Sequence, residues 1–163
     1  MELKKMLEEI AVQTQLLNEL LQVLERETAE MGDVNVNAMN LSNRSKEELT
    51  ARIAEHTPAL QKAISAQAVR EGLPGSASLG MVATHIAKRG NRELIAKQQQ
   101  IHRTAERVKQ VAALNREIAE RFASSITTSL NLITRLVNQS NVYGASGSYQ
   151  QRSAGAVMIN REA

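Results

Sequence analysis

The stretch from Asn91 to Gln139 constrains this chain most, because it contains neither Pro nor Gly and can form one unbroken helix. Apolar or small residues recur within it every three or four positions, as they do on one face of an α-helix. They are Leu94, Ile101, Ala105, Val108, Ala112, Ala119, Phe122, Ile126, Ile133 and Leu136. At ~1.5 Å per residue the helix would reach roughly 70 Å, which is too long for a compact globule, so it needs long helical partners.

The first partner is expected between Leu3 and Met31. Its apolar residues alternate spacings of three and four, which predicts a helix with a coiled-coil-like seam. Gly32 is then expected just beyond the end of this helix, and Asp33 as the N-cap of the next one.

The second partner is expected over residues 33–71. Val34, Leu41 and Leu49 keep one helical register through its Asn-rich start. Ser45 opens the sequence SKEE, which is itself a capping box, and this makes it a rival first residue. The sequence alone does not choose between the two starts.

A short helix is expected between the second and the last long helix. The turn Gly72-Leu73-Pro74-Gly75 stops the second helix, and residues 76–89 can form one or two helical turns. Gly90 then breaks the chain again and Asn91 caps the last helix.

The resulting prediction is an all-α, coiled-coil-like antiparallel bundle of three long helices and one short one, with every neighbouring pair antiparallel. Residues 1–140 form the helical domain. Residues 141–163 lack a helical period and are rich in Gly and Ser, which predicts a flexible C-terminal tail.

The distribution of charge bears on possible partners. Residues 1–33 carry three Lys or Arg and eight Asp or Glu, whereas residues 88–121 carry nine and four. The basic stretch could contact nucleic acid. Pairing of an acidic first helix with a basic last helix explains it better, because no aromatic residue is interleaved for base stacking. We therefore expect no nucleic-acid partner.

Composition also limits the compartment. The chain has no Cys, which excludes disulfides and thiolate metal sites and agrees with a reducing environment. Polar residues break every apolar run near the N-terminus, so we expect no signal peptide and no direct membrane insertion. The expected location is cytoplasmic.

The sequence offers no catalytic constellation, so we expect no enzyme activity, no cofactor and no metal site. His56, His85 and His102 are scattered along the chain, and no phosphate-binding loop is present. One alternative is a histidine phosphotransfer domain, because the sequence from His85 to Gly90 faintly resembles the His-x-x-Lys-Gly pattern of those helical bundles. Its glycine is displaced by one position.

The end of the long helix is unusually apolar. Between residues 122 and 137 Arg135 is the only charged residue, and the apolar residues cover well over half of the helix circumference. Two bundle partners cannot cover so wide a surface, so another chain is expected to bind there. The expected binding residues are Phe122, Ile126, Leu130, Ile133, Leu136 and Val137. The alternative is a structural coiled-coil module that only self-associates, and a homodimer of the free protein is possible on either reading.

Both tyrosines, Tyr143 and Tyr149, lie in the predicted tail. A solvated tail has little use for tyrosine, whereas a linear recognition motif uses it as an anchor with a low ordering cost. The alternative that Tyr143 folds back on the end of the bundle stays open.

In order and length, nearly the whole chain resembles the FlgN family of bacterial flagellar export chaperones. The matching features are the leucine-rich LLNELLQVLERETAEM, the joint Gly32-Asp33, the pair Gly72-Leu73 and the long-helix sequence NREIAERFASSITTSLNLITRL. The most specific feature is the Tyr-Gly-x-x-Gly motif from Tyr143 to Gly147.

The resemblance implies a function and two sites. In that family the helical body binds the C-terminal helical segments of the hook-associated junction proteins FlgK and FlgL and keeps them from assembling before export. By resemblance, client binding falls on the last helix. The tail tyrosine is implicated in docking to the export-gate protein FlhA, and by resemblance that role falls on Tyr143, with Gly144 and Gly147 of the same motif.

Overall fold

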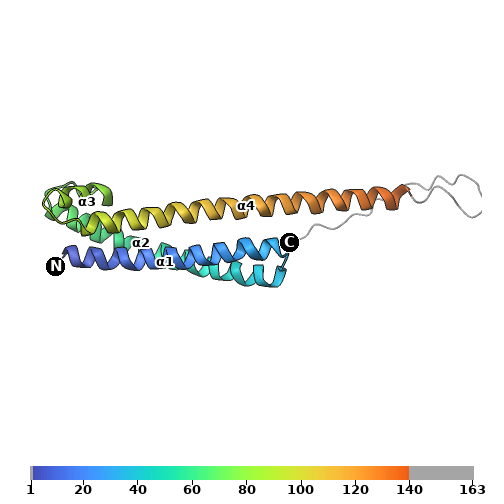
Figure 1. Ribbon diagram of the computed structural model, residues 1–163, viewed down its shortest axis with the longest axis horizontal. Coiled ribbons are helices and arrows are strands. Elements are labelled where there is room, and N and C mark those ends of the chain that lie inside the picture. The colour runs from blue at the N-terminus through green and yellow to red at the C-terminus, as the bar shows by residue number, and fades with distance from the viewer. Residues whose placement is uncertain (1, 140–163) are drawn as a thin grey trace, which may run out of the picture. The chain divides into compact units, whose positions relative to one another are not determined.

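In the computed structural model the described residues, 2–139, form four helices (Figure 1). Their bounds are α1, Glu2–Gly32; α2, Val36–Arg70; α3, Leu79–Ala87; and α4, Glu93–Gln139. The described part of the chain contains no strand, and the all-α prediction of three long helices and one short one is confirmed. The described residues divide into two units, 2–118 and 119–139, and each is described by itself below.

Helices α1 and α2 lie side by side and run antiparallel (Figure 1). Polar pairs between them show the direction, because residue numbers fall along α1 as they rise along α2. These pairs are Glu30–Ser42, Glu27–Lys46, Glu19–Arg52 and Glu9–His56. The two helices thus form the expected helical hairpin.

The first part of α4 packs on α1 in the same direction. The residue numbers of their polar contacts increase together along both helices. These contacts are Thr104–Asn18, Arg107–Glu25 and Asn115–Glu27. The expectation that all neighbours are antiparallel was therefore wrong for α1 and α4. The chain reverses once before α2 and once before α4, and two reversals restore the original direction. The expected pairing of acidic α1 with basic α4 is present in the ion pair Glu25–Arg107.

The hydrophobic core joins all four helices. Met6 and Ile10 of α1, Val82 of α3 and Leu94 of α4 are completely buried. Leu60, Ala63 and Ala68 of α2 complete the same cluster. Helix α3, although only nine residues long, closes this end of the bundle because three of its residues are buried, namely Val82, Ala83 and Ile86.

The joint between α1 and α2 differs from the expectation. Helix α1 includes Gly32, and the N-cap of α2 is Asn35, whose side chain accepts a hydrogen bond from the N–H of Ala38 at 3.1 Å. Asp33 is not the cap. Val34 turns the chain between the helices with a φ of 53°, an unusual conformation for a β-branched residue. Helix α2 runs unbroken from Val36, so Ser45 is not its start.

The register expected at the start of α2 was also wrong. Leu41 is 65% exposed and Val34 is 62% exposed, whereas Ser42 is 3% exposed. Ser42 faces α1 because its hydroxyl donates to a carboxylate oxygen of Glu30 at 2.7 Å. Leu49 is buried as expected, so the apolar seam begins only two turns later.

The turns after α2 follow the sequence closely. Gly72 has a φ of 74°, and the N–H of Leu73 donates to the carbonyl of Ala68 at 2.9 Å, as in a Schellman motif. The hydroxyl of Ser78 caps α3. The side chain of Asn91 accepts a hydrogen bond from the N–H of Glu93 and so caps the start of α4 as expected.

Candidate functional site

The apolar residues at the end of α4 are exposed to solvent. Their exposed fractions run from 40% for Phe122 to 66% for Leu136. The set comprises all six expected client-binding residues, Phe122, Ile126, Leu130, Ile133, Leu136 and Val137, together with Leu132. We call these seven residues the apolar face.

The apolar face is organised along one side of the helix. Phe122, Ile126, Leu130, Ile133 and Val137 follow one another at spacings of four, four, three and four residues, which aligns them in a single row. Leu136 and Leu132 widen the row on one side. Because a partner helix presents its own apolar residues at the same spacings, the row has the form that an amphipathic helix can pack against.

The threonine hydroxyls within this segment need no hydrogen-bond acceptor from a partner chain. The hydroxyls of Thr127, Thr128 and Thr134 each donate to the carbonyl four residues earlier, at 2.9 to 3.0 Å. Their hydrogen-bonding protons are thus used inside α4 itself. A partner chain covering the face would not have to supply acceptors for them.

The same side of α4 is buried in the first unit. Leu94 and Val111 are buried, and Asn115, which lies seven residues before Phe122 in the same register, is 5% exposed. Helix α1 supplies the covering residues there, and it ends at Gly32, four residues after Thr28. Helix α4 continues for 24 residues after Asn115, to Gln139. The apolar pattern of α4 therefore continues into the second unit, where its large apolar residues are exposed.

A buried polar cluster ties three helices together within the first unit. The amide nitrogen of Asn115 donates to the carbonyl of Leu24 and to a carboxylate oxygen of Glu27, both at 2.8 Å. Its amide oxygen accepts from the hydroxyl of Thr28 at 2.5 Å. The ammonium of Lys46 on α2 donates to the other oxygen of Glu27. Sequence reasoning missed this cluster because polar residues carry no signal in a hydrophobic pattern.

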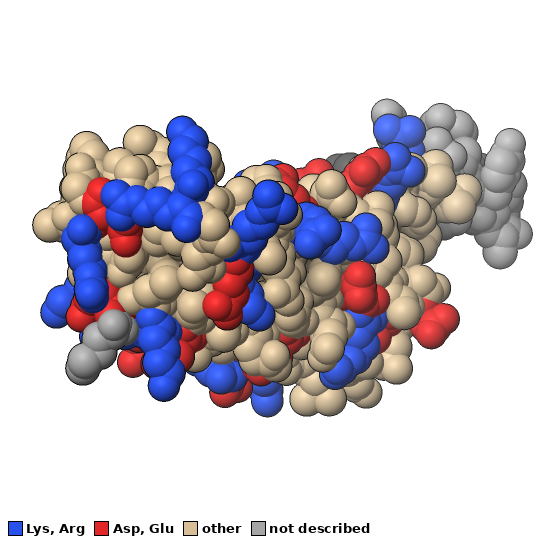
Figure 2. Space-filling view, turned by 60° about the vertical axis from the view of Figure 1, so that its left-hand side comes forward, with Lys and Arg blue, Asp and Glu red and all other residues tan. Residues whose placement is uncertain are grey.

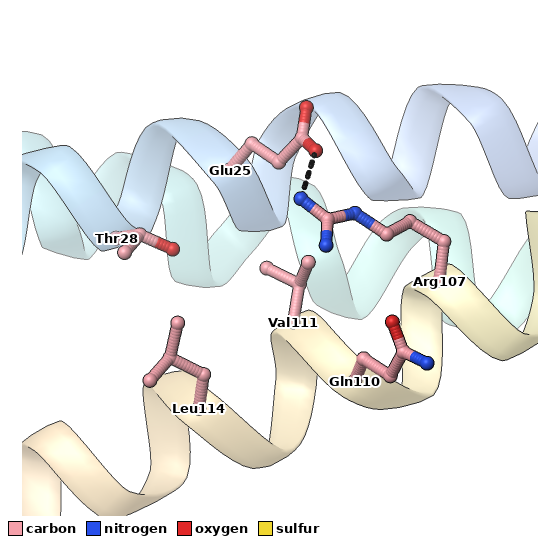
Figure 3. Close-up of a pocket in the computed structure, with 6 residues that line it drawn as sticks. All are labelled: Glu25, Thr28, Arg107, Gln110, Val111 and Leu114. Atoms are coloured by element: carbon pink, nitrogen blue, oxygen red, sulfur yellow. Dashed lines mark hydrogen bonds and ion pairs between the residues drawn. The ribbon is translucent and has the colours of Figure 1, made fainter.

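Next to this cluster, α1 and α4 border an open cavity of about 450 Å³ (Figure 3). Arg107 reaches across to Glu25 at 3.4 Å, and Val111 points from α4 toward α1 between Leu114 and Arg107. The cavity is lined by the ion pair Glu25–Arg107, the polar side chains of Thr28 and Gln110, and the aliphatic side chains of Val111 and Leu114. It is a gap between two packed helices.

The comparison with known families decides the identity of the chain. The family model described as FlgN protein matches residues 1–151. The chain belongs to the FlgN family. No curated protein and no solved structure matches it.

FlgN-family proteins are flagellar export chaperones that bind flagellar hook-associated proteins, so membership assigns this chain a chaperone role of that general kind. The match includes the whole apolar face and also the motif from Tyr143 to Gly147. Tyr143, Gly144 and Gly147 themselves lie outside the described residues. The predicted flexible tail, residues 141–163, lies outside them as well.

Two of the three histidines of this FlgN-family chain, His56 and His85, have buried ring atoms or contacts between helices. The ring nitrogens of His56 lie 2.6 Å from Oε1 of Gln13 and 2.7 Å from Oε2 of Glu9, which joins α2 to α1. Nε2 of His85 is buried and has no hydrogen-bond partner among the described residues. Phosphotransfer needs a ring nitrogen that solvent and phosphodonor can reach, and Nε2 of His85 does not meet this requirement. Residues 2–139 contain no group of three or more His, Asp or Glu placed to hold a metal ion.

The charged surface fits helix pairing. On the face seen in Figure 2, Lys and Arg side chains alternate with Asp and Glu side chains. Such mixing favours ion pairs within the bundle over attraction of a polyanion. Among the described residues, no helix is long and apolar enough to cross a membrane.

Proposed function

We propose that this FlgN-family chain binds, through the apolar face of α4, the C-terminal helical segments of hook–filament junction proteins of the FlgK and FlgL type. The observation that supports this is the row of apolar residues, more than half exposed at Ile126, Leu130 and Ile133, in a chain whose family binds flagellar hook-associated proteins in general. A client helix would bury its own assembly surface against this row until export. This client binding takes place in the cytoplasm and needs no catalytic group or cofactor.

A charge placed in the row tests the client site. Ile133→Asp should weaken binding of a junction-protein C-terminal peptide by at least ~30-fold, or about 2 kcal/mol, because the carboxylate would lose its water without gaining a partner. The measurement is a calorimetric titration, with the thermal midpoint of each variant recorded. The matched control is Asn131→Asp, on the opposite side of the same helix, which should bind like the parent chain. Unchanged affinity of a folded Ile133→Asp variant would place the client elsewhere.

For the tail we propose a second, separable role, which is docking on the cytoplasmic domain of an export-gate protein of the FlhA type through Tyr143, Gly144 and Gly147. The support is the Tyr-Gly-x-x-Gly motif inside the family match. Tyr143→Ala removes an aromatic anchor and should cost about 2 kcal/mol, or some thirtyfold in gate affinity. Client affinity should stay constant. Equal loss of both affinities would mean instead that Tyr143 completes the client site.

The alternative to a chaperone is a module that only associates with itself. The apolar face alone would suffice for such a module. Size exclusion of the chain mixed with a junction-protein peptide separates the two functions, because a self-associating module forms no mixed complex.

A further inference from the structure

The chain carries a second apolar segment that the chaperone function does not use. Residues 156–159, Ala-Val-Met-Ile, form the longest apolar run after residue 140, and polar or glycine residues flank them on both sides. The family match ends at residue 151, so this run lies outside the part of the chain that the family accounts for. Its composition is unexpected for a stretch that only links or solubilises.

We infer that the run Ala156–Ile159 covers the apolar face of α4 in the client-free chain. Exposed Ile126, Leu130 and Ile133 offer an apolar row, and the run offers three large apolar side chains in succession. Covering one with the other removes apolar surface of both from water.

The intervening sequence has the right length. Sixteen residues, 140–155, separate the end of α4 from the run, and seven of them are Gly or Ser. A linker of that composition has an end-to-end distance of about 20–24 Å. From Gln139 back to Ile133 the helix rises about 9 Å, and back to Ile126 about 20 Å. The linker is therefore long enough to bring the run to any residue of the row between Ile126 and Ile133.

The same tether favours this occupant over a second copy of the chain. A short linker holds the run at an effective concentration on the order of 1 mM beside the row. A second chain at micromolar concentration would need an affinity about a thousandfold higher to compete equally. The run has few side chains, so a client helix that contacts the whole row displaces it. The covering itself does not depend on the client function; only its role as a displaceable competitor rests on the function proposed above.

Disulfide trapping tests the covering directly, since the chain has no Cys of its own. The full chain with Ile133→Cys and Ile159→Cys should form an intrachain disulfide at least ~10-fold faster than the matched chain with Asn131→Cys and Ile159→Cys. Asn131 lies on the opposite side of α4, at a nearly equal distance along it. Non-reducing gels and peptide mapping separate intrachain from interchain bonds.

Each outcome decides the inference. Faster intrachain bonding through Ile133→Cys supports it. Equal rates for the two chains overturn it, and predominant interchain bonding overturns it in favour of a second copy. As an independent measurement, deletion of residues 152–163 should raise the fluorescence of an apolar dye about two- to threefold, and Ile133→Asp should reduce that rise. An unchanged dye signal after the deletion contradicts the covering even if client binding is intact.

Discussion

The two parts of α4 have the same apolar periodicity and opposite surroundings. In residues 93–118 the apolar side faces α1, with Leu94 completely buried and Val111 nearly so. In residues 119–137 the same side is exposed at every large apolar residue. Periodicity therefore identifies the side of a helix that needs covering but not what covers it. A helix segment with this much exposed apolar sequence has the composition of a binding surface.

The largest expected effect on stability comes from comparing one leucine in each part of α4. Leu94→Ala should lower the free energy of unfolding by about 2–5 kcal/mol, because it opens a cavity in the shared core. Leu130→Ala, in the exposed part, should change it by no more than ~0.5 kcal/mol. Urea unfolding followed by circular dichroism measures both. A large loss for Leu130→Ala would mean that the exposed part is covered in the free protein far more tightly than a short displaceable segment can achieve.

A smaller effect on stability is expected from comparing one asparagine in each part of α4. Asn115→Ala removes the donor to Glu27 and the acceptor for Thr28, and it should cost about 1–3 kcal/mol because these groups are buried. Asn131→Ala on the same helix should be nearly neutral or slightly stabilising, since Ala has the higher helix propensity. Thermal unfolding of the two variants gives the comparison. Equal costs would contradict the role assigned to the buried cluster.

The smallest effect concerns the exposed pair Glu106 and Lys109. The hydrogen bond and charge of Lys109 lower the pKa of the Glu106 carboxyl below its ordinary value of 4.5. A lowered pKa contributes stability above the ordinary pKa, and that contribution is lost as the pH falls through the folded-state pKa. Lys109→Ala should therefore lower the urea midpoint slightly at pH 7 and not at pH 3. Because water screens both groups, a large change at either pH would contradict this surface role.

Sequence reasoning was reliable where apolar residues alone decide the packing. Ile10, Leu49 and Leu94 lie in the core as their periodicity predicted. It failed where polar residues occupy the seam, because Gln13, Glu27 and Asn115 are buried through hydrogen bonds between helices. The register predicted for the start of α2 was wrong for the same reason, since the contact of Ser42 with Glu30 turns Leu41 outward.

The composition of the candidate site could be predicted from the sequence, but the partner that fits it could not. The scarcity of charge from residue 122 to 137 predicted an uncovered surface, and the exposed fractions of Phe122, Ile126 and Ile133 agree with it. Which partner fits the face depends on contacts with another chain, and no pattern within one sequence encodes these directly. The family match narrows the choice of partner because it adds information from related chains.

The side-chain amide of Asn115 also determines the register in which α4 packs against α1. If α4 slid by seven residues against α1, either Val108 or Phe122 would take the place of Asn115 opposite the Glu27 carboxylate. An aliphatic or aromatic side chain cannot donate to that carboxylate, so each shifted register would leave a buried charge short of a partner. One polar residue thereby fixes the register of α4 against α1.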